Sequence, residues 1–292
     1  MQRQGGISRL WHALLPRLSM RFNLTPLERA DVFLSTYYRR APFGIRSLVL
    51  VYDMIAERYP LIGRYHPDAI DKRYAIANAT KVIAISQQTA CDVEKLMGRT
   101  VDAIAYPGIE PDFGIVRADA VEQFQSFIGK PYFLIVGKRG LYKNVQVLYQ
   151  AWGSWKGHEQ YAIVCVGGEP NLPADIAFDN KFPGVRKPVI LEDADLPLAY
   201  AGAVALVYPS LIEGFGLPAL EAMACHCPVI GGETLREVCG EYAHYVDVTR
   251  PKDIQRGLDA VVSDKKPSKV HTEAFCWDKM ADTMSEVIRS MV

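Results

Sequence analysis

The segment at residues 208–223 constrains the fold more than any other part of this 292-residue chain. Its first residues are apolar and typical of the end of a buried strand, whereas Pro218 suits the first turn of a helix, where its missing N–H breaks no hydrogen bond. Between them, Gly214 and Gly216 let the backbone approach a ligand closely. The segment therefore predicts a strand, a glycine-bearing loop and a helix whose N-terminus can bind an anion.

Two carboxylates stand in this segment, Glu213 in the loop and Glu221 at the start of the helix. Beside a phosphate site, a carboxylate suits sugar and ribose hydroxyls, because it only accepts hydrogen bonds and repels the phosphate. The residues therefore indicate a site for a nucleotide–sugar diphosphate. The groups expected to hold the diphosphate or the sugar are the backbone N–H groups of Gly214, Phe215, Gly216 and Leu217.

The spacing of Glu213 and Glu221 resembles the E-x7-E signature of the family 4 retaining glycosyltransferases. A strand followed by Gly137, Arg139 and Lys143 resembles the phosphate loop of the same family. Further segments that resemble the family lie at residues 82–89, 106–109, 196–203 and 203–210. Together these pieces cover most of the chain beyond residue 80, and they imply transfer of a sugar from a nucleotide donor.

The resemblance assigns a role to each of these side chains. Glu213 is expected to contact the hydroxyls of the donor sugar, and Glu221 the hydroxyls of the ribose. Arg139 and Lys143 form a positive pair, because a leaving nucleoside diphosphate develops charge that needs fixed cations or a metal. No acidic pair is assigned to a divalent metal, so catalysis without a metal or another cofactor is expected.

Strand-like apolar runs alternate with helical stretches along the chain, which is typical of doubly wound parallel sheets. The first predicted sheet takes residues 32–35, 47–52, 81–86 and 101–106, and the second takes 132–137, 161–167, 189–191, 205–208 and 228–231. The expected α/β fold is the GT-B arrangement of two Rossmann-like domains that the resemblance implies. Its predicted parts are a reduced acceptor-side domain at 1–113, a nucleotide-sugar domain at 114–276 and a helix at 277–292 that crosses back to the first domain.

The N-terminal part departs from the family pattern. Gly5 and Gly6 resemble the glycine loop that normally follows the first strand and faces the diphosphate or the acceptor, yet only four residues precede it. The first domain is therefore either a compact variant or completed by a partner chain or another protomer. Two alternatives to a complete enzyme follow, namely a non-catalytic nucleotide-sugar-binding protein and a half-enzyme.

The net charge is zero, but residues 1–50 carry eight Arg against Glu28 and Asp31. This basic region allows peripheral contact with anionic lipid or with a lipid-linked phosphate, and a solvated basic face explains it equally well. The apolar helix face that starts at Trp11 suits either a core or a membrane surface. Nucleic acid is not an expected partner, because the arginines are not interleaved with stacking aromatics in a recognisable motif.

Tyr52 and Asp53 occupy the place where the family usually carries His-Asp. A tyrosine hydroxyl has a reference pKa of about 10, so Tyr52 is a poor general base near neutral pH. The resemblance implies that the donor phosphate takes the acceptor proton, and the change need not stop catalysis. Asp53 either orients the site or caps the following helix.

The six cysteines are scattered, which suits a reducing compartment, and neither a signal peptide nor a membrane-spanning run is evident. The expected location is cytoplasmic, with peripheral contact at the inner face of the membrane as an option. Cys225-His226-Cys227 is too tightly spaced for a zinc site, so a packed core is expected there. His226 replaces the Gly that the family usually has after this helix.

The function that the resemblance favours is a retaining hexosyltransferase of surface polysaccharide synthesis. The acceptor is expected to be a glycan or a lipid-linked glycan. Mannose, rhamnose, glucose and N-acetylhexosamine donors all remain open. GDP-mannose is weakly favoured, because residues 5–9 resemble enzymes of O-antigen assembly.

Overall fold

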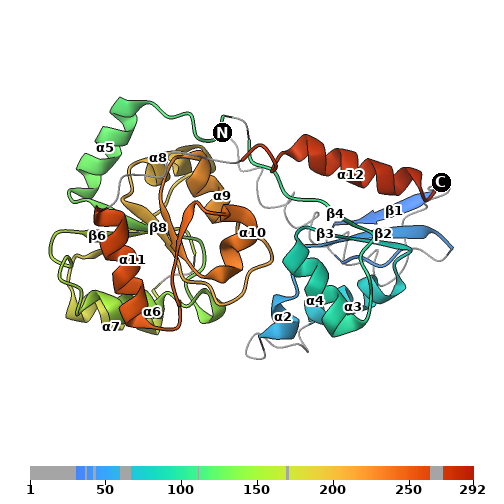
Figure 1. The fold of residues 1–292 in the computed structure, drawn as a ribbon, viewed down its shortest axis with the longest axis horizontal. Coiled ribbons are helices and arrows are strands. Elements are labelled where there is room, and N and C mark those ends of the chain that lie inside the picture. The colour runs from blue at the N-terminus through green and yellow to red at the C-terminus, as the bar shows by residue number, and fades with distance from the viewer. Residues whose placement is uncertain are drawn as a thin grey trace, which may run out of the picture. The chain divides into compact units, whose positions relative to one another are not determined.

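A computed structural model describes residues 31–36, 38–41, 44–59, 67–110, 112–168, 171–263 and 272–292 (Figure 1). Its internal contacts divide the chain into two units, one with the residues up to Ala105 together with Ala281–Val292, and the other with Tyr106–Met280. The boundary thus lies at Tyr106 rather than near residue 113. The predictions for Gly5, Gly6 and the first apolar helix concern residues outside the described part of the chain.

The first unit contains a parallel sheet with the strand order β1-β2-β3-β4. Its strands are β1 (Val32–Ser35), β2 (Arg46–Val51), β3 (Lys81–Ala84) and β4 (Ala103–Ile104), and its helices are α2 (Ile55–Arg58), α3 (Pro67–Asn78) and α4 (Gln87–Met97). Each predicted strand of the first sheet is present, although β4 is much shorter than predicted. Val49 and Val82 of the sheet pack against Ile76 of α3 and Val93 of α4, which buries one apolar core.

The second unit contains a parallel sheet whose described strands follow the order β10-β9-β8-β5-β6-β7. These strands are β5 (Tyr132–Val136), β6 (Ala162–Val166), β7 (Arg186–Val189), β8 (Ala205–Tyr208), β9 (Val229–Gly231) and β10 (Ala243–Tyr245). The helices of this unit are α5 (Ala118–Ile128), α6 (Gln146–Trp152), α7 (Pro173–Lys181), α8 (Leu196–Ala201), α9 (Leu217–Ala224), α10 (Arg236–Cys239) and α11 (Pro251–Ser263). The last helix, α12 (Trp277–Arg289), begins in this unit. Short 3₁₀ turns are η2 (Leu141–Lys143), η3 (Asp193–Asp195) and η4 (Glu233–Leu235).

Two strands of the second sheet differ from the prediction. β10 has no predicted counterpart, because its three residues are only half-buried and form no apolar run. β7 ends at Val189, where the predicted strand begins, and it contains Pro188. Its position at the edge of the sheet explains the proline. A proline has no N–H to donate to a neighbouring strand, and an edge strand has a neighbour on one side only. The predicted α/β fold with parallel sheets is otherwise confirmed.

An aromatic cluster fixes β5 against α6. The ring of Phe133 on β5 meets Trp152 and Trp155 edge to face, with centroids 6.1 Å and 5.6 Å away. Such pairs add to the stabilisation that burial of the rings already provides. The strand and the helix on either side of the predicted phosphate loop are therefore held firmly together.

The strand order reverses between β5 and β8. The chain first extends the sheet from β5 through β6 to β7, and then returns to place β8 on the other side of β5. β5 and β8 pair through Phe133 with Ala205 and Leu134 with Leu206. In open parallel sheets, ligands bind beyond the carboxyl ends of the strands at such a switch point. The loops that follow β5 and β8 flank this position.

The end of α9 explains the unusual His226. This residue has a φ of 54°, in the left-handed region, and its N–H donates to the carbonyl of Met223. The N–H of Cys227 donates to the carbonyl of Ala222, which completes a Schellman motif, where Gly is the usual residue. Cys227 and its neighbour Cys225 are buried thiols, so the prediction of a packed core at this turn is confirmed.

The C-terminal helix α12 begins in the second unit and belongs to the first from Ala281 onward. Met280 in the first turn of this helix is buried, and so is Met291 just beyond its end. Among the described residues, we find no helix that combines the length and the apolar character needed to cross a membrane.

Candidate functional site

The two predicted ligand loops leave neighbouring strands at the switch point. Gly137 directly follows β5 and has a φ of 84°, which a residue with a side chain rarely adopts. The loop after β8 leads to Glu213, and the N–H of Leu211 in this loop donates to the carbonyl of Tyr142 in the other, at 2.8 Å. The structure therefore brings the phosphate loop and the signature loop together at one edge of the sheet.

Lys143 and Glu213 form an ion pair across these loops. The ammonium of Lys143 donates to Glu213 Oε1 at 2.8 Å and to the Tyr208 hydroxyl at 2.9 Å. The side chains of Lys143 and Glu213 are 15% and 7% exposed, so solvent screens this pair weakly. Burial and the Glu213 carboxylate raise the pKa of Tyr208, which keeps its hydroxyl protonated near neutral pH.

Arg139 is buried, contrary to what a diphosphate-binding cation leads one to expect. Its Nε donates to Asp175 Oδ2 at 3.1 Å, and its Nη1 donates to the carbonyl of Gly167 at 2.9 Å. Asp175 also accepts from the Tyr149 hydroxyl at 2.7 Å and from the N–H of Leu172 at 3.0 Å. The structure thus gives Arg139 an internal carboxylate partner on α7, and its contact with a diphosphate stays a prediction.

Glu221 lies on α9, one turn beyond the N-terminus of the helix. The Tyr200 hydroxyl on α8 donates to its Oε2 at 2.6 Å. Burial raises the pKa of Glu221, the hydrogen bond from Tyr200 lowers it, and the nearby Asp193 carboxylate raises it again. The pKa of Glu221 therefore lies above its ordinary value. Its helix α9 follows the signature loop, so Glu221 belongs to the same switch point as Glu213.

Phe215 anchors the signature loop from inside. Its ring lies 6.0 Å from the ring of Tyr106 and 5.4 Å from that of Phe275, centroid to centroid. Burial, followed by the Glu237 carboxylate, raises the pKa of Tyr106 to about 12, so this hydroxyl remains a donor. Gly216, with a φ of 108°, caps the helix α9. The loop therefore leads into a helix N-terminus as predicted, while the ligand roles of Gly214 to Leu217 stay predictions.

Tyr52 and Asp53 lie in the first unit, directly after β2, and not in the unit that holds Glu213. Tyr52 is 37% exposed, and burial raises its pKa, which agrees with a poor general base. Asp53 Oδ1 accepts from the N–H of Ile55 at 2.9 Å and pairs with Lys72 at 3.3 Å. Asp53 thus bonds the first N–H of the following helix, whose N-cap residue is Met54, and both roles left open for Asp53 stay predictions.

The chain contains a D-x-D spacing at Asp193 and Asp195 that the sequence interpretation overlooks. Both residues lie in η3, ahead of α8. Within the described ranges, no group of three or more His, Cys, Asp or Glu side chains is placed to hold a metal ion. Catalysis without a metal stays a prediction.

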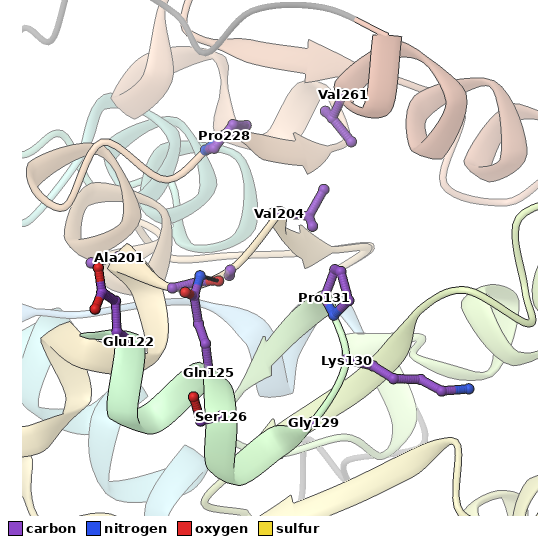
Figure 2. Close-up of a pocket in the computed structure, with 12 residues that line it drawn as sticks. Glu122, Gln125, Ser126, Gly129, Lys130, Pro131, Ala201, Val204, Pro228 and Val261 are labelled. Atoms are coloured by element: carbon purple, nitrogen blue, oxygen red, sulfur yellow. Dashed lines mark hydrogen bonds between the residues drawn. The ribbon is translucent and has the colours of Figure 1, made fainter. Parts of the chain in front are cut away.

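A cavity of about 810 Å³ opens at the opposite edge of the second sheet (Figure 2). Its lining includes Pro131 ahead of β5, Val204 ahead of β8 and Pro228 ahead of β9, so it lies at the amino ends of the strands. Gln125 of α5 crosses one side of it and donates to the carbonyl of Gly202 at 2.9 Å. None of the predicted site residues lines this cavity, and ligands of open parallel sheets bind at the other edge.

Comparison with known families agrees with this geometry. The family model described as glycosyl transferases group 1 matches residues 116–274, more than half of the chain. This chain belongs to the glycosyl transferase group 1 family. The match covers the second sheet and both ligand loops, so the family inferred from those loops is confirmed. The residues before 116 lie outside the match.

This family member is similar to O-antigen enzymes. It is 34% identical over 132 residues to O-antigen chain mannosyltransferase B of Escherichia coli, and the aligned segment covers 42% of this chain and 34% of the relative. It is 35% identical over 264 residues to the serotype-specific mannosyltransferase WbdA of Escherichia coli, and the aligned segment covers 81% of this chain and 32% of the relative. The chain thus spans about a third of the length of these relatives.

Solved structures share the fold at low identity. Sucrose-phosphate synthase from Thermosynechococcus elongatus has a TM-score of 0.77 at 20% identity, covering 97% of this chain and 79% of that one. Anabaena Alr3699/HepE, solved in complex with UDP-glucose, has a TM-score of 0.71 at 16% identity, covering 84% and 72%. These similarities confirm the predicted GT-B fold.

Proposed function

We propose that this chain is a retaining hexosyltransferase that moves a sugar from a nucleoside-diphosphate donor to a glycan or lipid-linked glycan, without a metal or another cofactor. The observation that carries the proposal is the meeting of two ligand loops at the switch point, where Lys143, Glu213 and Glu221 are placed. Surface polysaccharide synthesis is the proposed setting, because similar proteins are named O-antigen mannosyltransferases. A cytoplasmic location, with peripheral membrane contact through the basic N-terminal region, belongs to the same proposal.

GDP-mannose is the donor that we favour. The support comes from the names of the similar mannosyltransferases, since the residues of the two loops do not identify a base. UDP-hexoses are the main alternative, because one protein of the same fold is solved with UDP-glucose. Both donors present the same diphosphate and ribose to the loops, and they differ in the base and the sugar.

In the proposed reaction, Lys143 stabilises the leaving diphosphate. Its ammonium has three N–H groups, of which Glu213 and Tyr208 accept two, and we assign the third to the diphosphate. The N-terminus of α9 adds backbone N–H groups and the positive end of the helix dipole. Glu213 is assigned to the sugar hydroxyls, and Glu221 to the ribose. These fixed groups meet the charge that develops as the glycosidic bond to phosphate breaks.

The acceptor proton is proposed to go to the donor phosphate. Tyr52 has a pKa raised by burial, so its hydroxyl is protonated near neutral pH and cannot accept that proton. Arg139 is proposed to brace the phosphate loop from below, because its guanidinium is bound by Asp175. We therefore assign neither Tyr52 nor Arg139 to proton transfer, and we assign both to positioning the groups of the site.

A thermal-shift panel of GDP-, UDP-, dTDP- and ADP-sugars, with magnesium and with EDTA, tests the donor site. A donor at 100 times its dissociation constant adds about 2.7 kcal/mol to the free energy of unfolding. For a chain of this size, that corresponds to a rise in Tm of roughly 4 °C. A rise for one base that persists in EDTA supports the proposal, and no rise with any donor rejects it.

A transfer assay with the donor from this panel then tests the chemistry. Glu213→Gln is expected to lose most transfer, whereas Glu233→Gln, at an exposed carboxylate of the same unit, is expected to keep it. NMR of the product reports whether the anomeric configuration of the donor is retained. An inverted product would reject the retaining mechanism and leave the donor site intact.

A second candidate is a nucleotide-sugar-binding protein without transfer activity, or a half-enzyme completed by a partner chain or a second copy. Two observations favour it, the sheet β1–β4, which is the sheet of the first unit within the described residues, and Tyr52 where the family usually carries His. A clear donor shift without transfer to any acceptor would support the binding protein. Activity that appears only after a second chain is added would support the half-enzyme.

A further inference from the structure

The hydroxyl of Tyr200 holds one oxygen of Glu221. Tyr200 lies on α8 and is completely buried, with its hydroxyl 2.6 Å from Glu221 Oε2. Its ring packs 6.3 Å from that of Phe113, which limits the directions in which the hydroxyl can point. Burial and the Glu221 carboxylate raise the pKa of Tyr200, so the phenol remains a donor near neutral pH.

The surroundings of Glu221 otherwise oppose its negative charge. Burial raises its pKa, and so does the Asp193 carboxylate of η3, whereas the Tyr200 hydrogen bond lowers it. Burial raises the pKa of the Cys225 thiol, at the end of α9, to about 12, so this thiol stays neutral. Other titratable side chains on elements near α9 have partners of their own, namely Tyr208 on β8 and Arg236 and Glu237 on α10. Within the described residues, Tyr200 is therefore the group that favours an ionised Glu221.

A carboxylate with one oxygen fixed presents its second oxygen in a defined direction. In Glu221 this second oxygen is Oε1, and the side chain lies at the switch point beside the signature loop. Ribose hydroxyls donate to an ionised carboxylate more strongly than to a neutral acid. An acceptor that is fixed before the ligand arrives discriminates strictly against an analogue that lacks the donor, because the acceptor is then left unpaired.

We propose that Tyr200 is a positioning residue for the donor, which fixes the Glu221 carboxylate so that the site selects ribonucleoside diphosphates over their 2′-deoxy or 3′-deoxy analogues. This inference rests on the proposed function, in which Glu221 binds the ribose. Tyr200 itself is buried beneath the carboxylate and does not touch the nucleotide. It acts on the ligand through Glu221 alone.

A purely structural role for Tyr200 has a matched control in Tyr132. Both side chains are fully buried tyrosines of the second unit, and the Tyr132 hydroxyl donates to the carbonyl of Ala199, also on α8, at 2.8 Å. Tyr200→Phe removes a buried hydroxyl from a residue of α8, and Tyr132→Phe removes a buried hydroxyl that is hydrogen-bonded to α8. Only the first removes a hydrogen bond to Glu221.

The experiment is isothermal titration of the full chain with GDP or UDP, whichever binds, and with its 2′-deoxy and 3′-deoxy analogues, between pH 5 and pH 8. We expect the unmodified protein to prefer the ribonucleotide at least tenfold over one of the analogues. Tyr200→Phe is expected to reduce this ratio several-fold, and Tyr132→Phe to preserve it. Loss of the hydrogen bond raises the pKa of Glu221, so the pH below which affinity declines should move upward in Tyr200→Phe only.

A second variant guards against a Tyr200→Phe protein that does not fold. Glu221→Asp shortens the side chain by one methylene, withdraws the carboxylate from the Tyr200 hydroxyl and is expected to lose the same ratio. The inference is overturned if Tyr200→Phe keeps both the ratio and the pH dependence, or if Tyr132→Phe changes them equally. Failure of the unmodified protein to bind any nucleoside diphosphate would instead reject the proposed function, and this inference with it.

Discussion

Replacing Asp175 with Asn tests how the phosphate loop is held. Asp175 is the third residue of α7, and it pairs with Arg139 where the two side chains are 1% and 3% exposed. Removing one partner of such a buried pair costs about 3–5 kcal/mol, because the other charge stays buried without compensation. The amide oxygen of Asn still accepts one hydrogen bond, so we expect Asp175→Asn to lower the free energy of unfolding by roughly 2–4 kcal/mol.

Denaturant unfolding at neutral pH measures this loss against a surface control. Glu233 pairs with Arg236, and both side chains are well exposed, so Glu233→Gln should cost about 1 kcal/mol or less. The phosphate loop should also loosen in Asp175→Asn, which would weaken binding of the donor. Equal losses of stability in the two variants would refute the reasoning that burial makes the Arg139–Asp175 pair important.

The pH dependence gives the same test with a defined sign. Burial raises the pKa of Asp175, but hydrogen bonds from Leu172 and Tyr149 and the charge of Arg139 outweigh it, so the pKa is lowered. A lowered pKa stabilises the folded state fully above the unfolded-state pKa of about 3.9, and this contribution is lost as pH falls through the folded-state pKa. The difference between the unmodified protein and Asp175→Asn should therefore be constant from neutral pH down to about pH 5 and narrow below about pH 4. A difference that widens on acidification would contradict an ionised Asp175.

Four further outcomes are expected. His226→Gly should raise the free energy of unfolding by about 1 kcal/mol in denaturant titrations, because Gly adopts the φ of 54° without strain, whereas His226→Ala should not. Glu213→Gln should bind nucleoside diphosphate about tenfold more tightly by calorimetry while its transfer rate falls, since Lys143 loses its carboxylate partner. Tyr52→Phe should leave the pH–rate profile unchanged between pH 6 and 9, and a lost alkaline limb would contradict this. EDTA should not alter the transfer rate, and restoration by magnesium after its loss would reject the metal-free mechanism.

Much of the fold could be predicted because buried parallel strands form short apolar runs. β5, β6 and β8 are such runs, and glycine-bearing loops follow β5 and β8. β10 and β7 could not be placed, since half-buried edge strands carry no continuous apolar signal. The position of β8 beside β5 is also not contained in any local pattern, because pairing depends on packing of the whole sheet.

The residues of the candidate site are marked in the sequence to different degrees. Lys143 and Glu213, seventy residues apart, are both identifiable because each lies in a loop with its own glycine signal. The partners of the other site residues lie on different elements, so nothing local marks Asp175 as the partner of Arg139 or Tyr200 as that of Glu221. His226 could be recognised as unusual in the sequence, because Gly is the usual residue at this helix end. The reason for that preference, a φ of 54° in the left-handed region, is visible only in the structure.

The pairing of the two loop cations limits how a diphosphate can bind. Arg139 and Asp175 neutralise each other beneath the loop, and Lys143 and Glu213 do so at its surface. A diphosphate that binds the third N–H of Lys143 therefore shares this ammonium with Glu213, because the Arg139 pair is almost sealed from solvent. A donor that carries its sugar offers Glu213 hydroxyl donors in exchange, whereas a nucleoside diphosphate alone leaves this carboxylate facing a like charge. We infer that the Lys143–Glu213 pair favours the complete donor over the nucleoside diphosphate that remains after transfer. For the same reason, Glu213→Gln is expected to bind nucleoside diphosphate more tightly, because the like charge is removed.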